Sequence, residues 1–161
     1  MVTFNQTEHL ALLRSIENAP DFGDKALHFI VNKIVETTGI ESCSIMKLED
    51  DLLKIKAAKG LADHIIKSTS LGLGEGISGW VAKQASPLLV KDVGTHSIFR
   101  VQKKWGERAY KTNSLLCLPI IYENKVIGVL NLTDKSTGQH FIKEDLMFFT
   151  EVTKKIAEVL K

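Results

Sequence analysis

Apolar residues recur at helical spacing near both ends of the chain and alternate as in strands through its middle. The first helix is predicted within residues 4–18, with an apolar face at Leu10, Leu13 and Ile16. A second helix is predicted from Asp24 to Gly39, and a third over residues 142–160. Their apolar faces comprise Leu27, Ile30, Val31, Ile34 and Val35 in the second helix, and Leu146, Phe149, Val152, Ile156 and Leu160 in the third.

Between these helices the pattern predicts two hairpins and a long excursion. Residues 41–48 and 52–58 form the first hairpin, and residues 114–122 and 125–133 form the second. The excursion, residues 60–110, contains a short helix from Ile77 to Gln84 and a short strand at 88–90. This order predicts an α+β fold: a central antiparallel sheet with the N- and C-terminal helices on one face. The other face is covered by the short helices and loops of the excursion.

Composition narrows the class of protein. The 161 residues fit one domain spanning 1–161, with 44% apolar and 25% charged residues. The net charge is only +2 and no block of basic residues is present, so the sequence does not predict a surface that binds nucleic acid. No apolar run reaches the roughly 18 residues of a membrane span. The N-terminus does not resemble a signal peptide, and Cys43 and Cys117 form no C-x-x-C pair. We therefore expect a reduced, cytoplasmic protein that binds neither nucleic acid nor membrane.

A glycine-rich stretch, GEGISGWV at residues 74–81, matches G-x-G-x-x-G. A dinucleotide-binding loop needs a buried strand before it and a long helix after it, and a kinase needs a later Asp-Phe-Gly. The chain has none of these, so the nucleotide interpretation fails. Instead, Gly72, Gly74 and Gly76 are predicted to permit a sharp turn, and Gly79 to permit close approach of the short helix to the sheet.

Residues 71–93 (LGLGEGISGWVAKQASPLLVKDV) and 114–135 (SLLCLPIIYENKVIGVLNLTDK) together resemble the central signature and last hairpin of GAF domains. Phe141 followed by Glu144-Asp145 resembles the opening of that family's final helix, and the family order fits residues 5–160. The resemblance implies a small-molecule sensing domain of the kind often attached to an effector. It also implies an antiparallel sheet with a ligand pocket opposite the terminal helices.

Cyclic-nucleotide-binding members of the family carry the motif N-K…F-x-x-x-D-E. Here it reads Asp134-Lys135, then Phe141, then Asp145-Leu146, so the Asn and the Glu of the motif are replaced. The resemblance implies an ion pair between Lys135 and Asp145 that holds a loop closed over the pocket. The alternative is that Asp145 caps the final helix. The two departures weaken the assignment to cyclic nucleotides.

The free methionine sulfoxide reductases form an enzymatic branch of the family, with cysteines in the excursion and a cage of acids on the last strands. The cage positions correspond here to Leu115, Asn131 and Thr133, and the excursion contains no cysteine. Cys117 lies mid-strand, where packing is expected. No two histidines have a metal-ligand spacing such as i, i+4. We expect no catalytic residue and no metal site.

Strand alternation places Val129, Asn131 and Thr133 on one face of the sheet, beside Leu115 and Cys117 of the neighbouring strand. The opposite face, with Gly128, Leu130 and Leu132, suits packing against helices. We predict a ligand site lined by these five residues and by four from the excursion, Trp80, Phe99, Arg100 and Trp105. Arg100 suits an anionic ligand. Alternatively, Trp80 and Phe99 fill the space themselves and Arg100 is a surface residue.

The predicted function is that of a non-enzymatic sensory domain that binds an unidentified small molecule and signals through its terminal helices to an effector domain or partner protein. Further apolar residues on those helices predict a homodimer, unless they are buried against a neighbouring helix of the same chain. They are Phe4, Leu12, Leu13, Met147, Phe148 and Ala157. Two alternatives stay open. One is a ligand-free dimerisation module, and the other is a thiol redox enzyme using Cys43 or Cys117.

Overall fold

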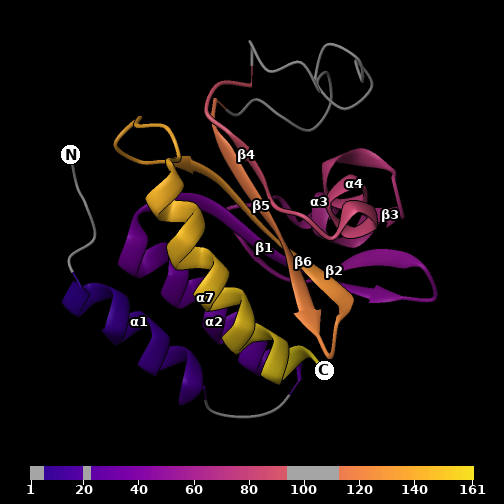
Figure 1. The fold of residues 1–161 in the computed structure, drawn as a ribbon, viewed down its shortest axis with the longest axis horizontal. Helices are drawn as coiled ribbons and strands as arrows, with labels where there is room; N and C mark the ends of the chain where they lie inside the picture. Colours follow the sequence, from indigo (N-terminus) through magenta and orange to yellow (C-terminus); the bar gives the residue numbers. More distant parts are fainter. Residues whose placement is uncertain (1–5, 20–22, 94–112) are drawn as a thin grey trace.

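The computed structural model describes residues 6–19, 23–93 and 113–161 of the chain. Within these ranges helices and strands follow the predicted order, with a short helix and a short strand, α3 and β3, that the sequence pattern did not predict (Figure 1). The elements are α1 (Gln6–Glu17), α2 (Asp24–Thr38), β1 (Ile40–Glu49), β2 (Leu52–Lys59), α3 (Asp63–Ser68), β3 (Ser70–Gly72), α4 (Gly76–Gln84), β4 (Leu88–Val90), β5 (Leu115–Tyr122), β6 (Lys125–Lys135) and α7 (Lys143–Leu160).

The strands form one antiparallel sheet in the order β3-β2-β1-β6-β5-β4. The two long hairpins, β1–β2 and β5–β6, lie next to each other because β1 pairs with β6. The α+β prediction with a central antiparallel sheet is therefore confirmed. Strand β6 lies in the middle of the sheet, which places its side chains far from either sheet edge.

Helices α1, α2 and α7 cover one face of the sheet, called here the helix face (Figure 1). Gly39 ends α2 in the left-handed conformation, at φ 69°, and donates its N–H to the Val35 carbonyl, as predicted for a glycine at this position. The helix-face core combines Leu27, Ile30 and Ile34 of α2 and Phe149, Val152 and Ile156 of α7 with Cys43, Ile45, Leu116, Leu118, Leu130 and Leu132 of the sheet.

The apolar face of α1 differs from the prediction. Leu12 and Ile16 are each 1% exposed, whereas Leu10 is 54% exposed and Leu13 is only partly buried. The reason is that α1 packs against α2 and α7, so its buried face is selected by contact with two helices. His9 of α1 stacks on Phe148 of α7, with ring centroids 4.0 Å apart. An ion pair between Glu17 and Lys155 adds a second link from α1 to α7.

The residues predicted to form a dimer surface are mostly buried within the chain. Phe148, Ala157 and Leu12 are 9%, 2% and 1% exposed, because the three helices of the helix face pack on one another. Leu13 is only partly buried, and Met147 is 62% exposed. Phe4 lies outside the described residues. The interpretation as burial against a neighbouring helix is therefore correct for Leu12, Phe148 and Ala157.

The opposite face of the sheet, called the α4 face, carries α4 (Figure 1). A second core lies between them. Its buried members are Met46, Leu53, Ile77, Val81, Ala82, Leu88, Val90, Leu115, Cys117 and Val129. The sheet thus separates two apolar cores, as the alternation along β5 and β6 predicted.

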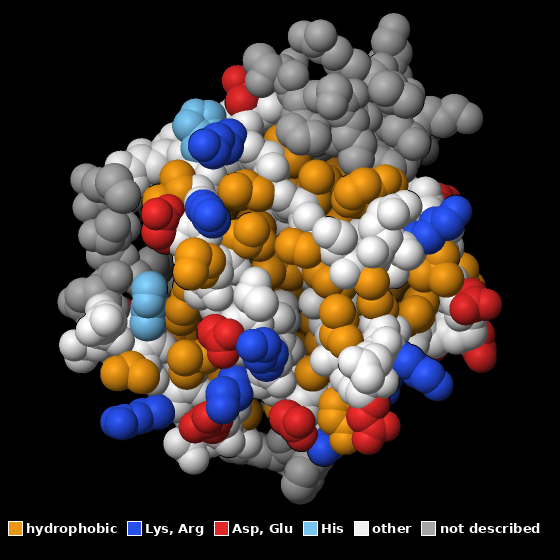
Figure 2. Space-filling view, viewed as in Figure 1, with side chains coloured by type: hydrophobic (Ala, Val, Ile, Leu, Met, Phe, Trp, Pro, Cys, Tyr) orange, Lys and Arg blue, Asp and Glu red, His pale blue; other side chains and the backbone are white. Residues whose placement is uncertain are grey.

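Basic and acidic side chains lie interspersed on the face drawn in Figure 2, with no block of one sign. Ion pairs form along α7, such as Lys154 with Glu151 and Lys161 with Glu158. Across the described ranges, no helix combines the length and the apolar character that a membrane span requires.

Candidate functional site

The glycine stretch forms a turn between β3 and α4. Gly74 and Gly76 have φ of 84° and 65°, the left-handed region that favours glycine. Gly72 does not, so the prediction was wrong for that position: it is the last residue of β3 and pairs with Leu52. The turn is closed by its own hydrogen bonds, with Gly74 N donating to Gly79 O at 2.7 Å and Gly72 N to a carboxylate oxygen of Glu75 at 2.9 Å. These backbone groups are occupied within the turn, which positions α4 over the sheet.

The register of β5 and β6 brings the strand residues of the predicted site together. Leu115 pairs with Thr133 and Cys117 pairs with Asn131, while Val129 lies two residues further along β6. Leu115, Cys117 and Val129 are at most 1% exposed and pack in the core under α4. Trp80, Asn131 and Thr133 keep part of their surface exposed. Phe99, Arg100 and Trp105 lie outside the described residues.

Asn131 is the centre of a polar cluster on this otherwise apolar face. Its Oδ1 accepts hydrogen bonds from Ser78 Oγ and from Cys117 Sγ, each at 3.0 Å. Its Nδ2 donates to Ser44 Oγ at 3.3 Å. Four elements, β1, α4, β5 and β6, therefore meet at one amide. At the next position outward on the same face, Thr133 forms a hydroxyl–hydroxyl hydrogen bond with Ser42.

Sequence reasoning missed Ser42, Ser44 and Ser78. Strand alternation along β1 places Ser42 and Ser44 on the face of Met46, so two small hydroxyl residues in a row on one face were a usable signal. Ser78 had no such signal, because a serine in the first turn of a short helix is common. Ser44 and Ser78 are 5% and 4% exposed, and burial of hydroxyl groups at this level requires hydrogen-bond partners.

The cluster is uncharged, and burial disfavours the thiolate form of its one thiol, Cys117. Burial raises the pKa of Cys117 far above its usual range, and the nearby Ser78 hydroxyl group opposes that shift only partly. Burial alone raises the pKa of Cys43, which lies on the helix face. In the described residues no group of three or more His, Cys, Asp and Glu side chains is arranged to hold a metal ion. The site can therefore form neutral hydrogen bonds and apolar contacts.

Lys135 and Asp145 form the ion pair that the resemblance implied, with Nζ 2.7 Å from Oδ2. Asp145 also accepts the backbone N–H of Ile142 at 2.8 Å, so the capping role is present as well. Lys135 Nζ lies 5.5 Å from the centre of the Phe141 ring, which is buried in the helix-face core. The pair thus joins the end of β6 to the first turn of α7.

The model of the GAF domain family matches residues 23–160 of this chain. The chain belongs to the GAF domain family. The family predicted from the glycine turn and the last hairpin is therefore confirmed. Helix α1 (Gln6–Glu17) precedes the matched region.

Solved GAF domains share this fold. The GAF domain of a phosphoenolpyruvate-protein phosphotransferase from Acinetobacter superposes with a TM-score of 0.81 at 23% identity, covering 99% of this chain and 94% of that one. A free methionine-R-sulfoxide reductase from Neisseria meningitidis superposes with a TM-score of 0.78 at 17% identity, covering 99% and 93%. A domain of a phosphotransferase and a sulfoxide reductase therefore share this architecture, and the superpositions establish the fold alone.

Curated relatives are larger proteins. The cone cGMP-specific 3',5'-cyclic phosphodiesterase subunit alpha' of Mus musculus is 24% identical over 166 residues, covering 94% of this chain and 19% of that protein. The Nif-specific regulatory protein of Azospirillum brasilense is 28% identical over 118 residues, covering 70% and 19%. This GAF domain spans about a fifth of the length of these two relatives and is homologous to a part of each.

Proposed function

We propose that this GAF domain is a non-enzymatic sensor that binds a small molecule on the α4 face and passes the change to its terminal helices. The observation that carries the proposal is the cluster around Asn131. A partly exposed amide in the middle of the sheet, held by Ser44, Ser78 and Cys117 between apolar walls, has the composition of a ligand site. A binding molecule acts only through different affinities for two states of the domain.

The relatives support a regulatory role. GAF domains are generally regulatory, and one relative is named as a regulatory protein and another as a cGMP-specific phosphodiesterase. Cyclic GMP is therefore the first nucleotide to test. The replacements at Asp134 and Leu146 argue for testing other classes in the same screen.

The chemistry of the described residues favours binding over catalysis. A thiol nucleophile reacts as the thiolate, and both thiols are buried with a raised pKa. The three positions that correspond to the acid cage of the reductases are occupied by Leu115, Asn131 and Thr133, which carry no charge. These features support a sensor without a thiol redox reaction.

We propose that α1 and α7 transmit the change caused by ligand binding to an effector domain or a partner protein. We also propose that the protein is a cytoplasmic homodimer. Leu10 of α1 and Met147 of α7 are the large apolar residues that are exposed on these two helices, at 54% and 62%. Among the described residues of the predicted dimer surface, Met147 is the one most exposed to a second copy of the chain. Sedimentation velocity of Met147→Lys beside the unmodified chain tests the dimer.

The ligand is tested by native mass spectrometry of freshly purified protein, followed by thermal-shift measurements with cGMP, cAMP, amino acids and oxo-acids. One class is expected to raise the melting temperature as its concentration rises above its dissociation constant. Asn131→Leu is expected to abolish that rise, while Thr150→Ala on the exposed face of α7 leaves it unchanged. A folded chain that responds to no class, or a response that persists in Asn131→Leu, contradicts the proposal.

A further inference from the structure

Ser114 is a buried serine immediately before β5, and its hydroxyl group bonds to two backbone groups. It is 2% exposed, and its Oγ donates to the carbonyl of Val90 at the end of β4, at 3.0 Å. The same Oγ accepts the backbone N–H of Phe141, just before α7, at 2.9 Å. One hydroxyl group therefore bridges the edge of the sheet to the approach of the terminal helix.

Asp134 completes this bridge from β6. Its backbone is held at φ 52°, a left-handed conformation that Asp tolerates better than most residues. Its Oδ1 accepts the backbone N–H groups of Asn113 at 2.9 Å and Ser114 at 3.0 Å, and its own N–H donates to Ser114 O at 3.0 Å. The adjacent residue, Lys135, forms the ion pair with Asp145 of α7.

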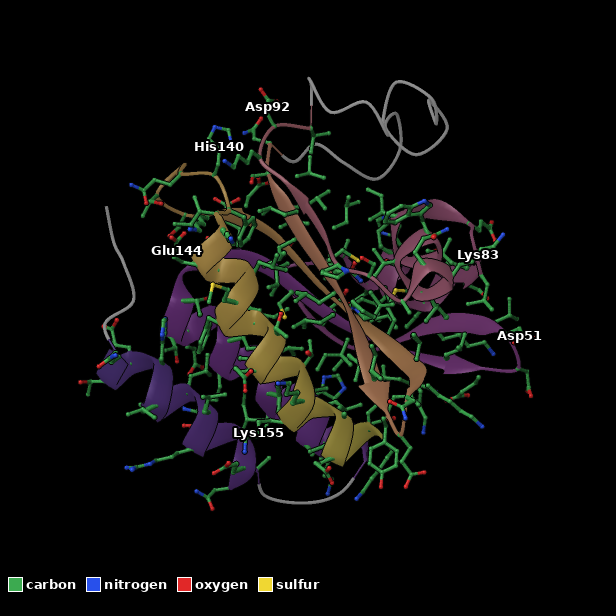
Figure 3. All side chains as sticks on the ribbon, in the orientation of Figure 1. Asp51, Lys83, Asp92, His140, Glu144 and Lys155 are labelled. Carbon is green, nitrogen blue, oxygen red and sulfur yellow. The ribbon has the colours of Figure 1, made fainter. Side chains whose placement is uncertain are left out.

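The same junction gathers both ends of the connection between β4 and β5. Val93 N donates to Asn113 O at 2.9 Å, so the two ends lie side by side. His140, before α7, forms a hydrogen bond with the carbonyl of Lys91. Figure 3 shows Asp92, His140 and Glu144 at this end of the molecule, where β4, the β6–α7 connection and α7 meet.

From this network we infer that Ser114 and Asp134 form a mechanical junction through which the position of the β4–β5 end of the sheet sets the position of the first turn of α7. An N–H···O hydrogen bond needs a donor–acceptor distance of about 2.7–3.2 Å and an angle near linear, so a displacement of Val90 or Asn113 must either move Phe141 or break its bond to Ser114. A buried N–H left without an acceptor is costly, which favours movement of the two elements together.

The inference rests on the proposed function only in treating α7 as the output element. The coupling between the β4–β5 end of the sheet and the first turn of α7 exists in the chain without ligand. It can be measured by NMR-detected amide hydrogen exchange on the full chain, which reports local opening residue by residue. A negative result leaves the thermal-shift test of ligand binding untouched.

The perturbing variant is Asp145→Asn, which weakens the ion pair with Lys135 but keeps an oxygen for the N–H of Ile142. Exchange is expected to rise about tenfold at the far end of the junction, at the amides of Val93, Asn113 and Ser114. The stability control is Ile30→Val, a small core truncation in α2. This substitution lowers global stability without touching the junction. The rise in exchange that it causes at these amides is therefore subtracted from the rise caused by Asp145→Asn.

The deciding comparison is Asp145→Asn in a chain that also carries Ser114→Ala. With the bridging hydroxyl removed, Asp145→Asn should cause no further rise at positions 93 and 113. A rise confined to α7 in the otherwise unmodified chain overturns the inference, as does an equal rise with and without Ser114. If Ser114→Ala does not fold, Asp134→Gly removes the carboxylate while keeping the left-handed backbone accessible, and the same comparison applies.

Discussion

A Cβ atom at Gly79 of α4 would lie 2.3 Å from the carbonyl oxygen of Gly72 at the end of β3. No real Cβ atom approaches backbone oxygen so closely, so glycine at position 79 is what allows α4 to pack against the turn that precedes it. The hydrogen bond from Gly74 N to Gly79 O, at 2.7 Å, depends on the same close approach. The glycine motif is therefore a packing device that positions Ser78 and Trp80 over the sheet.

Gly79→Ala is accordingly expected to destabilise the domain by about 1–3 kcal/mol, the usual cost of overpacking a site that cannot relax. The measurement is urea unfolding followed by tryptophan fluorescence. Gly72→Ala is the matched control, because its Cβ would meet only a carboxylate oxygen of Glu75 at 3.5 Å and its φ is not in the left-handed region. Equal stabilities of the two variants would contradict this account of the turn.

The ion pair between Lys135 and Asp145 is expected to contribute more than an exposed pair does. Its side chains are 15% and 11% exposed, so removing one partner leaves the other charge poorly solvated. Asp145→Ala also removes the acceptor of Ile142 N, and together these losses should cost about 2–4 kcal/mol in urea unfolding.

The exposed pair between Lys154 and Glu151 on the same helix supplies the control for that measurement. Its side chains are 65% and 57% exposed, and Glu151→Ala should cost less than about 0.5 kcal/mol. A comparable loss in both variants would mean that the Lys135–Asp145 pair is no stronger than a surface contact.

Local signals explain why most of the fold was predictable. The two hairpins were located because their strands alternate and their turns carry Asp50-Asp51 and Glu123-Asn124. All four turn residues adopt positive φ, between 49° and 63°. Elements α3 and β3, with 6 and 3 residues, are too short to show a period. The buried face of α1 was misplaced because α2 and α7, rather than a local pattern, select it.

The candidate site was only partly predictable for a related reason. Asn131, Thr133 and Cys117 follow from the alternation of one hairpin, which is local. Ser78 and Ser44 reach Asn131 from 53 and 87 residues away in sequence, across a helix and a different hairpin. A local sequence pattern cannot predict contacts over such separations. The cluster forms only because of the order of the strands in the sheet and the position of α4 over it.

His9 is expected to make the domain less stable in mild acid. Burial against Phe148 lowers its pKa from the usual 6.5, and the charges of Glu8 and Asp145 offset this only in part. The folded state therefore favours neutral His9, while the unfolded state binds a proton near pH 6.5. The contribution of neutral His9 to the free energy of unfolding is complete above pH 6.5. It is lost as the pH falls through the lower pKa that His9 has in the folded state.

The effect is expected to be well under about 1 kcal/mol, because His9 keeps contact with solvent. Urea unfolding gives the free energy of unfolding at about pH 7.5 and at about pH 5.5, and the difference between the two values measures the effect. That difference should shrink in His9→Gln and stay unchanged in His28→Gln, whose side chain is exposed. A difference that is the same in all three proteins would exclude His9 as its source.

The two thiols provide the sharpest test between a sensor and a redox enzyme. Cys43 and Cys117 are each 1% exposed, and burial raises the pKa of both, so almost no thiolate forms near neutral pH. Ellman's reagent should therefore label neither residue in the folded protein except at the rate of its unfolding, and should label both at once in urea.

Cys43→Ser combined with Cys117→Ser should keep any ligand-induced rise in melting temperature, because the hydroxyl group introduced at position 117 can still donate to Asn131. Rapid labelling of either native thiol, or loss of the ligand response in the double variant, would instead favour thiol chemistry, at the α4 face if the thiol is Cys117 and at the helix face if it is Cys43.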